Sequence, residues 1–122
     1  MNRAIITGRL GADVETFQTQ GGTAARFSVA TTEGWKDGEE WKERTDWHHV
    51  KTFLPGLAEM LAKHGKKGRR IEVIGKIQSS KYADKEGVER YSTEIIIGRD
   101  GTVDFPEPAR QRREEPAESV SS

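Results

Sequence analysis

Five strand-like segments, interrupted once by a helical segment, constrain the fold of this chain more than any other feature of its sequence. In the strand-like segments apolar and polar residues alternate between turn signals. Their expected ranges are 2–10, 24–33, 45–53, 70–82 and 88–98. The apolar spacing becomes helical only over 56–64, where Leu57, Met60 and Leu61 recur and Gly65 follows. The chain is therefore expected to be mainly β, with one short helix between the third and fourth strands.

A helix in that position of a five-stranded chain is the layout of the oligonucleotide-binding barrel, or OB-fold. We therefore predict an all-β, five-stranded OB-fold barrel that spans residues 1–104 as one domain. Residues 105–122 are polar and contain three Pro, and Val120 is their one large aliphatic residue. Such a segment buries too little apolar surface to offset the entropy lost on ordering, so we expect 105–122 to be a short disordered tail.

The composition excludes several classes of protein. The 122 residues include no Cys, which removes disulfide frameworks, Cys-ligated zinc and Cys nucleophiles. No apolar run approaches the roughly 18 residues of a membrane helix, so we expect a soluble protein of a reducing compartment. Lys and Arg number 20, and Asp and Glu also number 20, which leaves nucleic-acid binding open because a local basic groove is sufficient. The segment 63–70, with five bases and no acid, is either part of such a groove or a solvated helix end.

Aromatic residues fall on the polar sides of the expected strands. Trp47 and Phe53 are six residues apart, so an unbroken strand places them on one face, with His49 and Lys51 between them. Bases can stack on such rings while the cations follow the phosphates. The alternative is an amphipathic edge whose aromatic residues pack under a loop, and spacing alone leaves both interpretations open.

Two further aromatic residues have a similar setting. Tyr82 lies beside Lys81 on the polar side of the fourth strand, and Trp35 lies at the end of the second strand, next to a Lys. Together with Trp47 and Phe53 they make four aromatic residues on polar strand faces or at strand ends. This pattern is typical of base-stacking platforms, which tolerate any sequence because every base has a π-face.

Strand parity predicts the core. Ile71, Val73 and Ile77 share one side of the fourth strand, which we expect to face inward. Phe27 has core parity in the second strand, and Tyr91 shares parity with the isoleucines of the fifth. We therefore expect Phe27 to fill the barrel and Tyr91 to be buried or half-buried.

Other functions are less well supported by the residues. His48, His49 and Asp46 suggest a metal hydrolase, but adjacent strand residues point to opposite faces, so the two His cannot easily share one ion. No nucleophile elbow or phosphate loop is present, and we expect no catalysis, no metal and no cofactor. An OB-fold that serves only as a protein-interaction subunit of a replication or primosome assembly is the alternative function. Structured RNA is an alternative target, because stacking does not distinguish RNA from DNA.

These features occur together in one known family. The sequence resembles the bacterial single-stranded DNA-binding proteins over about residues 1–100. Several segments occur in the family's order, which makes the match more specific than any single motif. They are NRAIITGRLG (2–11), FSVATTEGW (27–35), ERTDWH (43–48), LAE (57–59) and DKEGVERYSTE (84–94).

The resemblance implies an OB-fold homotetramer that binds single-stranded DNA without sequence preference in replication, recombination and repair. It further implies a non-catalytic protein of the bacterial cytoplasm or nucleoid, without metal, cofactor or membrane. The family's base-stacking residues match Trp35, Trp47, Phe53 and Tyr82, and its subunit-interface His matches His48. We expect phosphates to be neutralised by part of 63–70 and by Arg3, Arg9, Lys51, Lys76 and Lys81.

The sequence departs from the family's pattern at four places. Tyr82 stands where the family often has Trp, and Leu54-Pro55-Gly56 carries an extra residue before the helix. Trp41 lies in an expected loop, where the family more often has a non-aromatic residue, and it has no assigned role. The chain ends in Ser121-Ser122 rather than in the family's acidic, Phe-terminated tip, so recruitment of partner proteins through such a tip is doubtful.

Overall fold

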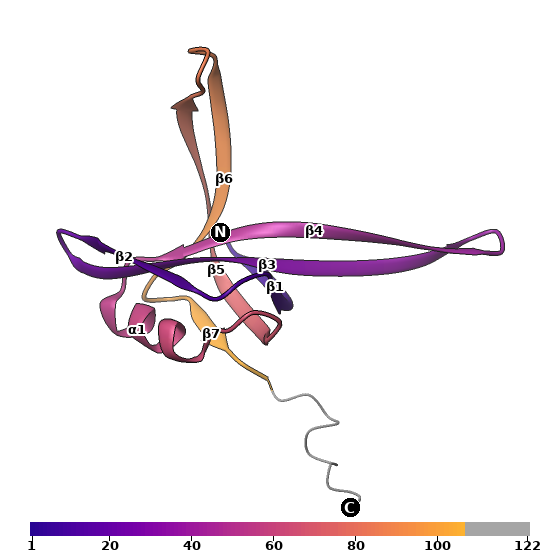
Figure 1. Ribbon diagram of the computed structural model, residues 1–122, viewed down its shortest axis with the longest axis horizontal. Helices are drawn as coiled ribbons and strands as arrows, with labels where there is room; N and C mark the ends of the chain where they lie inside the picture. Colours follow the sequence, from indigo (N-terminus) through magenta and orange to yellow (C-terminus); the bar gives the residue numbers. More distant parts are fainter. Residues whose placement is uncertain (107–122) are drawn as a thin grey trace, which may run out of the picture.

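The computed structural model describes residues 1–106, which form a closed β-barrel with one helix (Figure 1). The all-β OB-fold expected from the sequence is confirmed. Five strands pair side by side around the barrel, and pairing of the first strand with the last closes it. These strands are β1 (Ala4–Leu10), β3 (Gly22–Asp37), β4 (Glu40–Thr52), β6 (Glu89–Ile97) and β5 (Arg70–Ala83). The helix α1 (Pro55–His64) connects β4 to β5, as the sequence predicts.

Two short strands were not predicted. β2 (Glu15–Thr19) pairs with the start of β3, and β7 (Thr102–Asp104) pairs with β5. β2 has one large apolar residue and β7 has three residues in all, so neither shows an alternating pattern long enough to recognise. Phe105, expected at the start of the tail, packs against the core in the same way as Val103. The disorder expected for the tail applies mainly to residues 107–122, which lie outside the described residues.

The two strands of the central hairpin are longer than expected. β3 continues to Asp37 and β4 begins at Glu40, so the charged segment 33–46 is strand on both sides of a tight turn. Its side chains are nearly all exposed, so no buried face imposes an alternation on the sequence. Trp41 therefore lies in β4 and not in a loop. The β3–β4 hairpin and the β5–β6 hairpin project from the barrel in different directions (Figure 1).

The core lies inside the barrel and under α1. Its largest fully buried side chains are Leu61, Ile71, Ile97, Val29, Val50 and Val73. Phe27 is buried as predicted, but the expectations for Tyr91 and Ile77 are wrong, since both side chains are exposed. Strand parity is correct for both residues. Tyr91 lies where the β5–β6 hairpin has left the barrel, and Ile77 lies just beyond the last pair of β5 with β1, so no opposing layer buries either side chain.

Candidate nucleic-acid interface

Register pairing across three neighbouring strands assembles one outward face from the polar sides of the barrel. Arg9 of β1 lies opposite Ala30 of β3, and Ala30 lies opposite Trp47 of β4. The next pair, Leu10 and Val29, is buried. Since directly opposed residues project to the same side of a sheet, Arg9 and Trp47 stand on either side of the small Ala30 and face outward.

A second row continues this outward side onto the remaining strands. Lys51 of β4 lies opposite Ile96 of β6, and Ile96 lies opposite Lys76 of β5. Tyr82 follows Lys76 by six residues in β5 and therefore has the same parity. Lys51, Lys76 and Tyr82 thus face outward on the same side as Trp47.

Phe53 lies directly after β4, six residues beyond Trp47. Its ring packs edge-on against Phe17 of β2, with centroids 6.1 Å apart and planes at 88°. The guanidinium of Arg26 lies 5.6 Å from the centroid of Phe17, and Arg26 is the cross-strand neighbour of Lys51. This cluster supports the Phe53 ring at one end of the outward side. We call the whole surface the aromatic–basic face; it comprises Arg9, Arg26, Trp47, His49, Lys51, Phe53, Lys76 and Tyr82.

The rings expected to stack on bases are open to solvent. The four aromatic residues expected to stack on bases, Trp35, Trp47, Phe53 and Tyr82, have exposed fractions between 43% and 57%. The indole of Trp47 lies on Gly11, because a Cβ at residue 11 would fall 3.0 Å from Cη2 of Trp47 and closer still to its neighbour. The backbone at Gly11 therefore lies against the benzo ring of Trp47, while the rest of this side chain is open to solvent.

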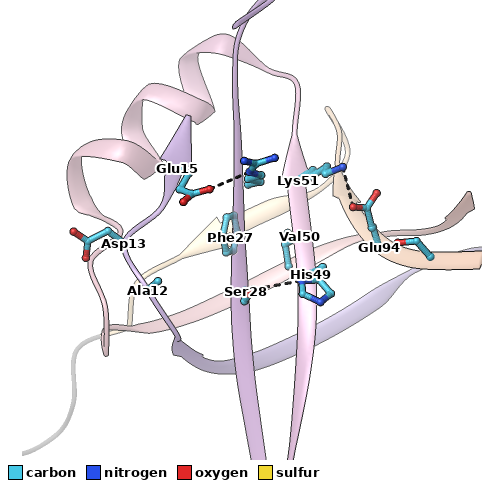
Figure 2. A pocket seen from close by; sticks show the side chains of 11 residues that line it. Ala12, Asp13, Glu15, Phe27, Ser28, His49, Val50, Lys51 and Glu94 are labelled. Atoms are coloured by element: carbon cyan, nitrogen blue, oxygen red, sulfur yellow. Dashed lines mark hydrogen bonds and ion pairs between the residues drawn. The ribbon is translucent and has the colours of Figure 1, made fainter. Parts of the chain in front are cut away.

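A hollow of about 460 Å³ lies on the aromatic–basic face between the start of β2 and strands β3, β4 and β6 (Figure 2). Its lining combines cations with carboxylates. The residues named in Figure 2 are Ala12, Asp13, Glu15, Phe27, Ser28, His49, Val50, Lys51 and Glu94. Within it, Ser28 Oγ and His49 Nδ1 are 3.4 Å apart, so the hydroxyl and the imidazole share a hydrogen bond.

The cations of the hollow are paired with acids in this structure. Lys51 Nζ lies 2.9 Å from Glu94 Oε2, and Arg26 Nε lies 3.0 Å from Glu15 Oε1 (Figure 2). Both Arg26 and Glu15 are largely exposed, so their pair is worth little and can exchange for another partner. The Lys51–Glu94 pair is better shielded from solvent. A polyanion on this face would compete with Glu94 for Lys51.

The position of the basic segment 63–70 is compatible with both roles that its sequence allowed, and its part in a basic groove stays a prediction. Arg70 lies opposite Arg9 in the β1–β5 pairing, so the segment reaches the edge of the aromatic–basic face. Arg9 Nη1 also donates a hydrogen bond of 3.0 Å to the carbonyl of Gly68. Arg69 Nη1, in contrast, donates to the carbonyl of His64 at the end of α1, which satisfies a helix-terminal acceptor.

Comparison with known proteins identifies the family. The model of the single-strand binding protein family matches residues 1–105. The chain belongs to the single-strand binding protein family. It is 38% identical, over 100 residues, to a single-stranded DNA-binding protein from Rhizobium meliloti (strain 1021). That match covers 80% of this chain and 58% of the relative, so the chain corresponds to a little over half of the relative's length.

A solved structure of the same family has the same fold. It is described as a Plasmodium falciparum SSB complex with ssDNA, and it superposes with a TM-score of 0.80 at 31% sequence identity. The superposition covers 88% of this chain and 96% of that chain. The resemblance to this family, stated above from the sequence segments, is thereby confirmed.

Six of the expected site residues of this family member lie on the aromatic–basic face, and the other four do not. Register places Trp35 of β3 opposite Lys42 and Lys81 of β5 opposite Tyr91. These parities put Trp35 and Lys81 on the sides of their hairpins opposite to Trp47 and Tyr82 respectively. Lys81 also pairs with Glu89 at 3.4 Å and lies 5.9 Å from the ring of Tyr91.

The two remaining site residues lie away from the aromatic–basic face or at its margin. Arg3 is exposed directly before β1. His48, the expected interface residue, is half-buried on the inner side of β4, where its Nε2 lies 2.8 Å from Thr31 Oγ1. The roles expected for both residues stay predictions.

The turn between β5 and β6 fixes the hairpin that carries Tyr82. Asp84 Oδ1 accepts hydrogen bonds of 2.9 Å from the backbone N–H groups of Glu86 and Val88, and Oδ2 accepts one of 3.0 Å from Arg90 Nε. The Arg90 guanidinium, followed by these backbone donors, holds the pKa of the Asp84 carboxyl below its ordinary value. Arg90 lies directly opposite Tyr82, so the same pair orders the side chains beside that ring.

Sequence reasoning missed Arg26 and Phe17. The signal for Arg26 was available, because its alternation with the buried Ala25 and Phe27 places it on the polar side of β3. Phe17 could not be assigned without β2. Within residues 1–106 no three His, Cys, Asp or Glu side chains gather closely enough to hold a metal ion. In the same residues, no helix is both long and apolar enough to cross a membrane.

Proposed function

We propose that this protein binds single-stranded DNA without regard to sequence, as a protective factor in DNA replication, recombination and repair. The observation that carries the proposal is the aromatic–basic face, on which Trp47, Phe53 and Tyr82 share one outward side with Arg9, Lys51 and Lys76. Exposed rings receive bases and the cations between them receive phosphates. The family of the chain and the DNA named in the related complex support the same function.

The exposed rings favour a single strand over a duplex. In a duplex each base is already stacked between its neighbours, so an indole can reach a base face only where the strands are open. A single strand presents its bases freely, and each base–ring contact is worth about 1–3 kcal/mol. Because the contact uses the π-face and no base-edge hydrogen bond, it does not select a sequence.

Phosphate binding in this proposal involves an exchange of partners. Lys51 leaves Glu94 for a phosphate, while Arg9 and Lys76 add further positive charge along the same face. Lys81 and Arg3 bind phosphates only where the strand leaves this face. Affinity should fall with salt at about −0.7 in log–log slope per phosphate contacted.

Trp35 requires the DNA to pass around the β3–β4 hairpin, because its ring lies on the side opposite to Trp47. A flexible single strand can follow such a path. The proposed role of Trp35 is therefore to receive a base from a strand that wraps the hairpin.

We also propose that the protein assembles as a homotetramer, which lets one strand visit several faces and raises its effective affinity. Half-buried His48 borders a hollow of about 340 Å³, whose lining combines apolar residues such as Ile6 and Ile77 with Trp47 and His49 at the margin of the aromatic–basic face. Ile77 is exposed in the single chain, so this region has apolar surface that a second copy could cover. Sedimentation of the full chain tests the assembly, and a monomer at micromolar concentration would contradict it.

The function is one of binding, without catalysis, metal or cofactor, and we place it in the bacterial cytoplasm or nucleoid. A purely protein-interacting OB-fold, the alternative considered from the sequence, gives no reason for three exposed rings and three cations on one side of the barrel.

The decisive test uses fluorescently labelled oligo-dT in an anisotropy titration, with a mixed-sequence strand and its duplex as controls. The proposal predicts similar affinity for both single strands and much weaker binding of the duplex. Equal affinity for strand and duplex, or no binding, would overturn it.

A further inference from the structure

Trp41 is an exposed indole that lies outside the set of rings proposed above to stack on bases. Its exposed fraction is 65%, compared with 57% for Trp47. It lies near the tip of the β3–β4 hairpin, in β4, and this hairpin projects from the barrel (Figure 1). An indole so exposed, on a hairpin covered by no other described element, has no packing role in the barrel core.

Parity places Trp41 on the same side of β4 as the aromatic–basic face. Trp41, Trp47 and Phe53 are spaced by six residues each, so three rings recur at about 20 Å intervals along one strand. The cross-strand neighbour of Trp41 is Lys36, which supplies a cation on the same side. Between Trp41 and Trp47 the same side of β4 carries Glu43 and Thr45, so Lys36 on β3 is the cation nearest to the Trp41 ring along this side.

The indole of Trp41 is supported in the same way as that of Trp47. A Cβ at Gly34 would lie 2.8 Å from Cε2 of Trp41 and closer still to the adjoining ring carbon. Residue 34 thus supports one side of the Trp41 ring, as Gly11 supports Trp47. In addition, Trp41 Nε1 donates a long hydrogen bond of 3.4 Å to Glu43 Oε2, which restrains the orientation of the indole. The other side of the ring remains available to a planar ligand.

We propose that Trp41 is a further base-stacking residue, which extends the DNA path of the aromatic–basic face to the tip of the β3–β4 hairpin. This inference rests on the proposed function, since its ligand is the same single strand. Glu43 beside the ring disfavours a phosphate there, so the contribution of Trp41 is stacking and not charge. The twist of a two-stranded ribbon turns the face along its length, so the path is a spiral that a flexible strand can follow.

The first test compares Trp41→Ala with Trp41→Phe in the full chain, using labelled oligo-dT of about 8 and about 30 nucleotides. Single OB-folds cover about 4–16 nucleotides, so the longer strand spans the distance from Trp47 to the hairpin tip. Trp41→Ala should weaken binding of the longer strand by about fivefold or more, whereas Trp41→Phe, which keeps a ring, should weaken it less. The salt slope should stay unchanged, because no phosphate contact is lost. Equal affinity of Trp41→Ala and wild type for the longer strand would overturn the inference.

A second test does not depend on removing the Trp41 ring. In the double variant Trp35→Phe, Trp47→Phe, Trp41 is the one remaining tryptophan, and its emission should be quenched when the longer strand binds. Gly34→Ala should displace the ring and reduce this quenching. Binding without any change in Trp41 emission would overturn the role of Trp41 while the proposed function stands. Failure of the wild-type chain to bind the strand would overturn both.

Discussion

The indole of Trp47 lies directly against Gly11 and leaves no room for a side chain at residue 11. Gly11 follows the last residue of β1, and its N–H donates a hydrogen bond of 3.1 Å to the carbonyl of Ser28 in β3. A residue far away in the sequence therefore sets the orientation of the ring that stands at the centre of the aromatic–basic face. The geometry of the aromatic–basic face therefore depends on this contact between strands as well as on the tryptophan itself.

Replacing Trp47 with Ala removes the central ring. We expect affinity for oligo-dT to fall by about 5–150-fold, which corresponds to about 1–3 kcal/mol per stacked base. The thermal midpoint should change little, because the ring is exposed and outside the core. Anisotropy titration and circular dichroism measure the two quantities. Wild-type affinity in Trp47→Ala would show that this residue does not stack on bases.

Gly11→Ala should weaken DNA binding although no aromatic residue is lost. The new Cβ would overlap the Trp47 ring, so the indole must tilt away from its support. The expected loss of affinity is smaller than for Trp47→Ala, and in the double variant Gly11→Ala, Trp47→Ala the two losses should not add. A double-mutant cycle measures this coupling, and full additivity would contradict the link between the two residues.

Glu94→Gln should strengthen binding. Glu94 holds Lys51 in an ion pair of 2.9 Å, and a neutral amide releases this cation to a phosphate. One additional phosphate contact steepens the log–log salt slope by about 0.7 and raises affinity by about fivefold at 0.1 M salt. Titrations at several salt concentrations measure both effects. An unchanged slope would indicate that Lys51 does not reach the DNA.

Lys76 and Lys81 lie in the same strand but on opposite sides of it, and so form a matched pair. Lys76→Gln should make the salt slope shallower by about 0.7, because its charge lies on the aromatic–basic face. Lys81→Gln should have a smaller effect, since Lys81 already pairs with Glu89. If Lys81→Gln had the larger effect, the assignment of the binding face on β5 would be wrong.

The Asp84 turn should respond to acid. Arg90 and the backbone donors lower the pKa of the folded Asp84 below its ordinary value of 3.8. The ionised carboxylate therefore stabilises the hairpin above pH 3.8, and this contribution is lost as the pH falls through the lower folded value. The amide resonances of Glu86 and Val88, which donate to Asp84, should titrate with a midpoint below 3.8. A midpoint at or above 3.8 would contradict the arrangement.

The barrel could be predicted because its strands have one buried side. Phe27 and Val29, like Ile71 and Val73, alternate with polar residues, and this period of two identifies a half-buried strand. The hairpin extensions could not be predicted in this way, since 33–46 has no buried side and its backbone is held by cross-strand pairing alone. Tyr91 was misplaced for the same reason, because parity gives a side but not whether that side is covered.

The positions of the proposed stacking residues could be predicted from the sequence to a similar extent. Even spacing placed Trp47 and Phe53 on one side, and the structure has them so. The opposite orientation of Trp35 required the register of β3 against β4, which the sequence does not contain. The support of two indoles by Gly11 and Gly34 joins residues that no local pattern connects.

The central claim, that bases stack on the exposed tryptophans, is tested most directly by intrinsic tryptophan fluorescence during titration with oligo-dT, with a matching duplex as control. The aromatic–basic face predicts strong quenching by the single strand that saturates with binding, and little quenching by the duplex. Binding of the single strand without quenching, or equal quenching by both ligands, would contradict stacking as the basis of recognition.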